Sequence, residues 1–325
     1  MKKKIYITRK LPSVVIEKLA NDFDIYMWQE EEQAVPRDVL LEQVKTADGV
    51  LTMLTETIDT EVLDAAPNLK VISNMAVGYN NIEVDEATKR GILVANTPGV
   101  LTETTADLTF ALLMATARRL VEASGYLREG KWETWSPLQL TGMDIHGATI
   151  GIIGFGRIGQ AVARRAKGFN MDILYYNRSR KIEAEEEMGA TYADFETVLK
   201  KSDFVCLLLP YSPEVHHLIS KNELSLMKKT AVLINTARGG IVDEEALYQA
   251  LKNKEIWAAG LDVFEKEPVD LDHPLLTLPN VVTLPHIGSA SIATRINMAQ
   301  LAADNLRNAL LQAGPVMKVN KPDGW

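Results

Sequence analysis

The sequence has little cysteine: Cys206 is the only one among 325 residues, so no disulfide can form within the chain. It lies in the apolar run Phe204–Leu209, where we expect a buried strand thiol. No apolar run approaches the roughly 18 residues that a membrane span needs, so none is expected. The basic start Met1–Lys4 is not followed by a long apolar stretch. We therefore expect no signal peptide and a cytoplasmic protein.

Positive charge is also scarce, with 35 Lys and Arg against 43 Asp and Glu and a net charge of −8. This balance disfavours nucleic acid or an anionic membrane as the main partner. Low-complexity segments and short repeats are lacking as well. Hydrophobic residues make up 46% of the chain, enough for sizeable cores, and the length suits two domains.

Short β-rich runs alternate with helical patterns along the chain, and this alternation predicts an α/β fold with parallel sheets and helices on both faces. In the first third, helices are expected to begin near Pro12, Pro36, Asp59 and Glu83, between strands at 4–8, 23–28, 49–54, 71–75 and 93–95. One long helix is expected from 103 to 130 and another from 291 to 313. Six further strands are expected at 148–153, 172–177, 204–209, 231–235, 258–263 and 281–284.

These elements predict two doubly wound parallel-sheet domains. A Rossmann cofactor domain at 101–287 is expected to be inserted in a flavodoxin-like substrate domain, formed by residues 1–100 and 288–325.

A glycine-rich turn, Gly154-Phe155-Gly156-Arg157-Ile158-Gly159, joins a predicted strand to a predicted helix. In this context the motif predicts a dinucleotide site. Gly154 makes the tight turn, Gly156 lets the backbone approach a pyrophosphate, and Gly159 lets the helix pack on the strand. The helix N-terminus offers N–H groups to the phosphates.

The end of the next strand selects the cofactor, because a carboxylate there binds the ribose 2′-hydroxyl of NAD. Here the residues are Asn177, Arg178, Ser179 and Arg180, with no carboxylate. Because arginine suits a 2′-phosphate, we expect NADP(H) to be preferred, with NAD(H) possible. The alternative is an ordinary charged loop.

His286 follows the last predicted strand, and ligands of open α/β sheets bind beyond the carboxyl ends of the strands. Reduction of a carbonyl needs a proton for the oxygen, which histidine supplies near neutral pH. A nearby carboxylate favours the charged imidazole. Either Glu265 or Glu267 could provide it, while Arg238 at another strand end could bind a substrate carboxylate. No metal is expected.

Four segments together resemble the D-isomer-specific 2-hydroxyacid dehydrogenases: 154–159, 235–240, 260–268 and 285–289. The resemblance extends over essentially the whole chain. It implies that Arg238, Glu267 and His286 form the catalytic triad, and it favours Glu267 over Glu265. It also implies cofactor contacts at Thr105, Leu209, Pro210, Thr236, Ala237, Asp262 and Gly288.

Within the family, the run Ser73–Ile82 looks most like the glyoxylate/hydroxypyruvate reductases. That resemblance implies substrate contacts at Leu54, Val77, Gly78 and Ser289, beside Arg238 and His286. It also implies a homodimer through the Rossmann domains, in which Trp135 would reach the partner's substrate site. Packing in the dimer core is the alternative for Trp135.

The sequence thus predicts an NADPH-dependent reductase of a small 2-oxo acid, glyoxylate or hydroxypyruvate, that forms the D-2-hydroxy acid with His286 as proton donor. Two alternatives stay open. One is a 2-ketogluconate reductase of the same branch, and the other is a non-enzymatic nicotinamide sensor resembling a co-repressor.

Overall fold

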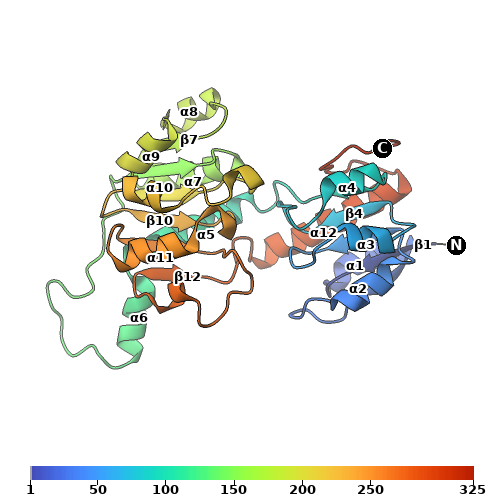
Figure 1. The fold of residues 1–325 in the computed structure, drawn as a ribbon, viewed down its shortest axis with the longest axis horizontal. Coiled ribbons are helices and arrows are strands. Elements are labelled where there is room, and N and C mark those ends of the chain that lie inside the picture. The colour runs from blue at the N-terminus through green and yellow to red at the C-terminus, as the bar shows by residue number, and fades with distance from the viewer. Residues whose placement is uncertain (1) are drawn as a thin grey trace. The chain divides into compact units, whose positions relative to one another are not determined.

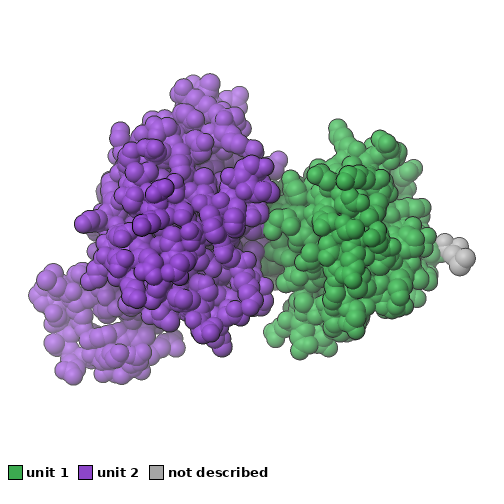
Figure 2. Space-filling view, viewed as in Figure 1, with its two compact units in different colours: residues 1–101, 290–325 green, residues 102–289 purple. Residues whose placement is uncertain are grey.

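The structure, a computed structural model, describes residues 2–325. They divide into two units: unit 1 contains residues up to Leu101 together with Ala290–Trp325, and unit 2 contains Thr102–Ser289. Figure 2 shows the two units in different colours. Relative to the expected domains, Leu101 lies in unit 1, and Gly288 and Ser289 lie in unit 2.

Unit 1 holds a five-stranded parallel sheet in the order β2-β1-β3-β4-β5, which is the flavodoxin-like order. Its strands are β1 (Lys3–Ile7), β2 (Phe23–Met27), β3 (Gly49–Thr52), β4 (Val71–Asn74) and β5 (Leu93–Ala95). Its helices are α1 (Ser13–Ala20), α2 (Arg37–Val44), α3 (Thr60–Ala65), α4 (Val84–Lys89) and α12 (Ile292–Leu311).

Two apolar cores cover the two faces of this sheet, one with residues of α2, α3 and α4 and the other with residues of α1 and α12. The C-terminal helix α12 therefore returns to unit 1 (Figure 1). It packs closely on the sheet: a Cβ on Gly49 would lie 2.8 Å from Leu306 Cδ1. The Ser73 hydroxyl donates a 2.7 Å hydrogen bond to the Ala302 carbonyl.

Unit 2 holds a seven-stranded parallel sheet in the order β12-β11-β10-β9-β6-β7-β8. Its strands are β6 (Thr149–Ile153), β7 (Asp172–Tyr176), β8 (Ala190–Tyr192), β9 (Phe204–Leu207), β10 (Val232–Asn235), β11 (Ala258–Leu261) and β12 (Val281–Thr283). Its α-helices are α5 (Thr102–Ala117), α6 (Leu120–Arg128), α7 (Arg157–Gly168), α8 (Ile182–Met188), α9 (Phe195–Lys201), α10 (Lys221–Leu226) and α11 (Glu244–Lys252). Short 3-10 helices are η1 (Pro213–Val215), η2 (Gly239–Ile241) and η3 (Pro274–Thr277).

The predicted α/β fold with two doubly wound sheets is confirmed, and the sheet of unit 2 has the Rossmann order with one strand added. Cys206 is fully buried in β9, as expected, and burial raises the pKa of its thiol to about 12. No helix of residues 2–325 combines the length and apolar character needed to cross a membrane.

Two expectations about unit 2 are wrong. The strand β8 was not expected, because only its first residue, Ala190, is buried and its three residues form no apolar run. The long helix expected at 103–130 is two helices, separated at Arg119, which has a φ of 53°. The break has a physical cause: the Ala117 carbonyl accepts the Met143 N–H at 2.9 Å, and the Arg119 guanidinium binds Glu122.

Candidate active site

The glycine-rich turn follows β6, and each of its three glycines has a different structural role. Gly154 has a φ of 99°, and a Cβ there would lie 2.6 Å from the backbone of Leu208. A Cβ on Gly159 would lie 2.3 Å from the Gly154 carbonyl, so only glycine lets the helix α7 approach the turn. A Cβ on Gly156 would meet nothing within 4 Å, so the turn is open there.

Gly156 is also the N-cap of α7 and makes no side-chain capping bond. The first N–H groups of this 12-residue helix are therefore available to an anion. The open face at Gly156 and these N–H groups fit the pyrophosphate of a dinucleotide cofactor. Of the other predicted members of the turn, Phe155 lies between Gly154 and Gly156, and Arg157 and Ile158 lie between Gly156 and Gly159.

The loop after β7 changes one expectation about the 2′-phosphate. Asn177 orders the loop, because its Oδ1 accepts the Phe155 N–H at 3.2 Å and its Nδ2 donates to the Ser179 carbonyl at 2.9 Å. The Arg180 guanidinium is engaged by Glu185, with three N···O distances from 2.8 to 3.1 Å. Arg178 and Ser179 are exposed, so they are the better phosphate candidates.

His286 lies just beyond β12 and has a φ of 53°, in the left-handed region that is uncommon for non-glycine residues. The buried Asp262 holds this backbone. Its carbonyl accepts the His286 N–H at 2.9 Å, and its two carboxylate oxygens accept the N–H groups of Ile287 and Gly288, both at 2.8 Å. Asp262 is 1% exposed, so it supports the His286 loop from inside the protein.

Glu267 is the carboxylate that faces His286. Its Oε2 lies 2.6 Å from His286 Nδ1, and its Oε1 accepts the Phe264 N–H at 3.0 Å. Burial acts to raise the pKa of Glu267, but the hydrogen bond to His286 and the charges of His286 and Arg238 outweigh it, so the pKa is lowered. An ionised Glu267 accepts from Nδ1, which leaves Nε2 as the nitrogen that can serve a substrate.

Arg238 follows β10 in a tightly held turn. Asn235 Nδ2 donates to the Arg238 carbonyl at 2.9 Å, and the guanidinium donates to the Ala237 carbonyl at 2.7 Å. A Cβ on Gly239 would lie 1.8 Å from the Phe264 carbonyl carbon, so this turn packs directly against the loop that contains Phe264 and Glu267. Burial lowers the pKa of Arg238, and the charge of Glu267 opposes that effect.

Glu265, the rival carboxylate, has a different partner. It contacts Nε2 of His217, whose ring stacks on that of His216. The remaining histidines are also engaged: His273 lies 3.1 Å from Glu244 and His146 lies 3.0 Å from Asn170. Sequence spacing alone could not choose between Glu265 and Glu267 as the partner of His286. In the structure Glu267 contacts His286 and Glu265 contacts His217.

The other residues expected near the cofactor lie around the same end of the sheet of unit 2. Thr105 Cγ2 would be 3.5 Å from a Cβ on Gly288. The hydroxyls of Thr109 and Thr236 lie 2.7 Å apart. Leu209, Pro210 and Ala237 follow β9 and β10, and the Leu209 nitrogen lies beside Gly154.

In unit 1, three successive carbonyls of the expected substrate loop are held by hydrogen bonds. The Ala76 carbonyl accepts from Thr97 N at 2.8 Å, that of Val77 from Asn96 Nδ2 at 2.8 Å, and that of Gly78 from Asn74 Nδ2 at 2.9 Å.

In a trans peptide the N–H points opposite to the carbonyl, so the N–H groups of Val77, Gly78 and Tyr79 point away from the three groups that bind these carbonyls. Within residues 2–325 these three N–H groups donate no hydrogen bond. Such a row of N–H groups is suited to an anion.

The structure corrects the position of one further substrate candidate and adds two residues to the site. Leu54 lies in the loop after β3, which ends at Thr52, and not on the strand. Asn74 and Asn96 were not singled out from the sequence. The only signal was a polar side chain at or just after the end of a buried strand.

Residues 110–288 match the profile of the D-isomer specific 2-hydroxyacid dehydrogenase, NAD binding domain. The glyoxylate reductase of Thermococcus gammatolerans is 53% identical over 333 residues, with 99% of each chain covered.

Two solved structures are similar over nearly the full chain. A protein from Thermus thermophilus superposes with a TM-score of 0.91 at 42% identity, covering 98% of this chain and 100% of that chain. The NADPH-dependent glyoxylate/hydroxypyruvate reductase from Sinorhizobium meliloti, in complex with NADP and malonate, has a TM-score of 0.86 at 35% identity, covering 98% and 97%. The chain therefore belongs to the D-isomer-specific 2-hydroxyacid dehydrogenase family of nicotinamide-dependent oxidoreductases.

Proposed function

We propose that this protein reduces a small 2-oxo acid, such as glyoxylate or hydroxypyruvate, to the D-2-hydroxy acid with His286 as proton donor. The observation that carries the proposal is the 2.6 Å contact between His286 Nδ1 and Glu267 Oε2 at the carboxyl end of β12. The position of His286 beyond the carboxyl end of a strand supports it, because ligands of open α/β sheets bind there.

The proton step uses the His286–Glu267 pair. Glu267 stays ionised, accepts a hydrogen bond from Nδ1–H and keeps the imidazole in one orientation. The protonated ring then donates from Nε2 to the carbonyl oxygen as that oxygen gains negative charge. When bound, the reduced nicotinamide supplies the hydride that converts the carbonyl carbon into the alcohol carbon.

Two sets of N–H donors suit the substrate carboxylate. In unit 2, Arg238 offers a fork of N–H donors that matches a carboxylate and also polarises the carbonyl. In unit 1, the N–H groups of Val77 and Gly78 form a second set suited to a carboxylate, and Leu54, in the neighbouring loop, suits the substituent on C2. Ser289, beside the His286 loop, adds a polar contact.

We infer that the cofactor is NADP(H) in preference to NAD(H). The loop after β7 has no carboxylate to bind a 2′-hydroxyl, and Arg178 and Ser179 are exposed there. The similar reductase from Sinorhizobium meliloti is described as NADPH-dependent. The nicotinamide end of the cofactor would be lined by Thr105, Thr236, Ala237, Asp262 and Gly288. The rest of the cofactor would be lined by Leu209 and Pro210.

A homodimer through unit 2 completes the proposal. The helix α6 and the loop after it expose large apolar side chains that a lone chain would leave in water. Their exposed fractions are 54% for Leu120, 57% for Leu127, 58% for Trp132, 75% for Trp135 and 82% for Leu138. A partner that covers this surface would also be the one whose substrate site Trp135 approaches. Light scattering of wild type and of Trp135→Ser tests the contact.

Initial rates of NADPH and NADH oxidation with glyoxylate, hydroxypyruvate and 2-ketogluconate test the function. Highest kcat/KM for NADPH with glyoxylate or hydroxypyruvate supports the full proposal. Highest kcat/KM with NADH would contradict the assignment of Arg178 and Ser179. A preference for 2-ketogluconate would contradict the role of Leu54, and no reduction of any acid would contradict the enzyme.

A further inference from the structure

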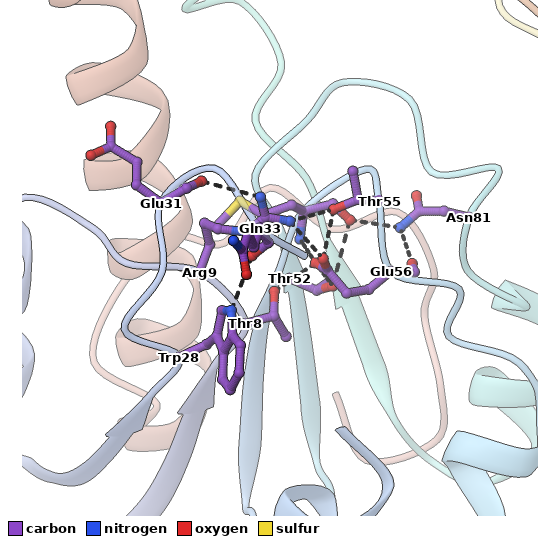
Figure 3. Close-up of polar contacts among 10 residues, drawn as sticks. Thr8, Arg9, Trp28, Glu31, Gln33, Thr52, Thr55, Glu56 and Asn81 are labelled. Carbon is purple, nitrogen blue, oxygen red and sulfur yellow. Dashed lines mark hydrogen bonds and ion pairs between the residues drawn. The ribbon is translucent and has the colours of Figure 1, made fainter. Parts of the chain in front are cut away.

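The loop after β3, Met53–Glu56, is fixed from inside by one buried carboxylate. Glu56 is 4% exposed, and it accepts hydrogen bonds from Met53 N at 2.9 Å, Thr8 Oγ1 at 2.6 Å and Thr55 Oγ1 at 2.6 Å. The Arg9 guanidinium lies 3.1 Å from the same carboxylate and balances its charge. Figure 3 shows these groups converging on Glu56.

Asn81 closes this loop from the other side. Its Nδ2 donates to the carbonyls of Met53 and Glu56, both at 3.0 Å, and so bridges the two ends of the loop that carries Leu54 (Figure 3). Asparagine suits this position because its amide offers two N–H donors to two carbonyls.

The third bond of Asn81 reaches the amide-bearing loop. Its Oδ1 accepts from Asn74 Nδ2 at 3.2 Å, and the same Nδ2 donates to the Gly78 carbonyl at 2.9 Å. Asn74 is fully buried at the end of β4, so it cannot exchange these bonds for water. A continuous path of side-chain amides thus joins the Leu54 loop to the Gly78 peptide.

We propose that Asn81 is a positioning residue that sets the spacing between Leu54 and the N–H groups of Val77 and Gly78, and thereby the fit of the substituent on the 2-oxo acid. The inference rests on the proposed function, which places the substrate at these groups. Both loops belong to unit 1, so the spacing is fixed within one rigid sheet edge. Asn81 itself touches neither substrate nor cofactor in this account.

Loss of the path has a specific kinetic signature. Asn81→Ala removes three hydrogen bonds without touching the His286–Glu267 pair, so kcat should stay near the wild-type value while KM rises about tenfold. The rise should be larger for hydroxypyruvate than for glyoxylate, because glyoxylate carries only hydrogen where hydroxypyruvate has a substituent facing Leu54. Asn81→Ser, whose hydroxyl can still donate to one carbonyl, should fall between Asn81→Ala and wild type.

The control is Asn280→Ala. Asn280 also donates its Nδ2 to two backbone carbonyls, those of Trp257 at 3.0 Å and Leu251 at 3.4 Å, but in unit 2 beside β11 and β12. It should lose stability and leave KM for both acids unchanged.

The experiment measures kcat and KM for both acids, inhibition by oxamate, the dissociation constant of NADPH and the Tm of each protein. We expect the Asn81 variants to weaken oxamate in parallel with KM and to bind NADPH as wild type does. The inference is overturned if KM stays unchanged, if kcat falls instead, or if the Asn81 variants unfold where Asn280→Ala does not. Wild type that reduces neither acid would refute the proposed function itself, which is a separate result.

Discussion

Nδ1 of His286 lies 2.6 Å from Oε2 of Glu267, whereas Glu265, two residues earlier in the same loop, contacts His217. Two carboxylates of one acidic loop therefore have different histidine partners. Substitutions of the two can be compared directly, because both are glutamates of one loop and only Glu267 faces the proposed proton donor.

Glu267→Gln should lower kcat by about a hundredfold, because the amide cannot stabilise the imidazolium of His286. Glu265→Gln is the matched control, and it should leave kcat near the wild-type value. Steady-state rates with glyoxylate compare the two variants. Equal losses in both would show that the loop as a whole matters, and not the Glu267 contact.

The lowered pKa of Glu267 predicts a pH dependence of stability. A carboxyl group whose folded pKa is depressed contributes stability above its unfolded pKa, about 4.3 for glutamate. That contribution disappears as the pH falls through the folded pKa. The Tm difference between wild type and Glu267→Gln should therefore be largest near neutral pH and shrink below pH ~4. A difference that grows on acidification would have the wrong sign.

Gly239→Ala should be strongly destabilising, since a Cβ would lie 1.8 Å from the Phe264 carbonyl carbon and 2.1 Å from its oxygen. The loops of Arg238 and Glu267 would have to separate. Gly168→Ala, at the last residue of α7, meets nothing within 4 Å and is expected to change the free energy of unfolding by less than about 1 kcal/mol. Thermal unfolding measures both, and a tolerated Gly239→Ala would contradict the described packing.

Arg178→Ala should raise KM for NADPH about tenfold and leave KM for NADH unchanged, because only NADPH has the 2′-phosphate. Arg180→Ala should have a smaller effect on the NADPH constant, since Glu185 already holds that guanidinium. Initial rates at saturating glyoxylate give both constants. Equal effects of Arg178→Ala on the two cofactors would exclude a 2′-phosphate contact.

Much of the fold could be predicted from the sequence, because local patterns determine it. The first four helices of unit 1 begin immediately after Pro12, Pro36, Asp59 and Glu83, where proline and acidic residues indicated their starts. Every strand except β8 lies in an apolar run that could be recognised in the sequence. The break at Arg119 could not be predicted, because it depends on the Ala117 carbonyl pairing with Met143, which is distant in sequence.

The candidate site also contains residues that the sequence indicated and residues that it could not. Strand-end positions indicated His286 and Arg238, while spacing alone could not choose between Glu265 and Glu267. The pairing of Arg180 with Glu185 and the amide path through Asn74 and Asn81 arise from side chains that meet only in the folded chain. Their residue types carry no motif, so a sequence pattern has nothing to detect.

The rate of glyoxylate reduction by His286→Asn tests the proton donor itself, with the substitution of a histidine outside the site, His146→Asn, as control. His286→Asn should lower kcat by about 10²–10⁴-fold, the contribution of general acid catalysis, while its dissociation constant for NADPH should stay at the wild-type value. His146→Asn should retain wild-type kcat. Full kcat in His286→Asn would contradict the assignment of His286 as proton donor.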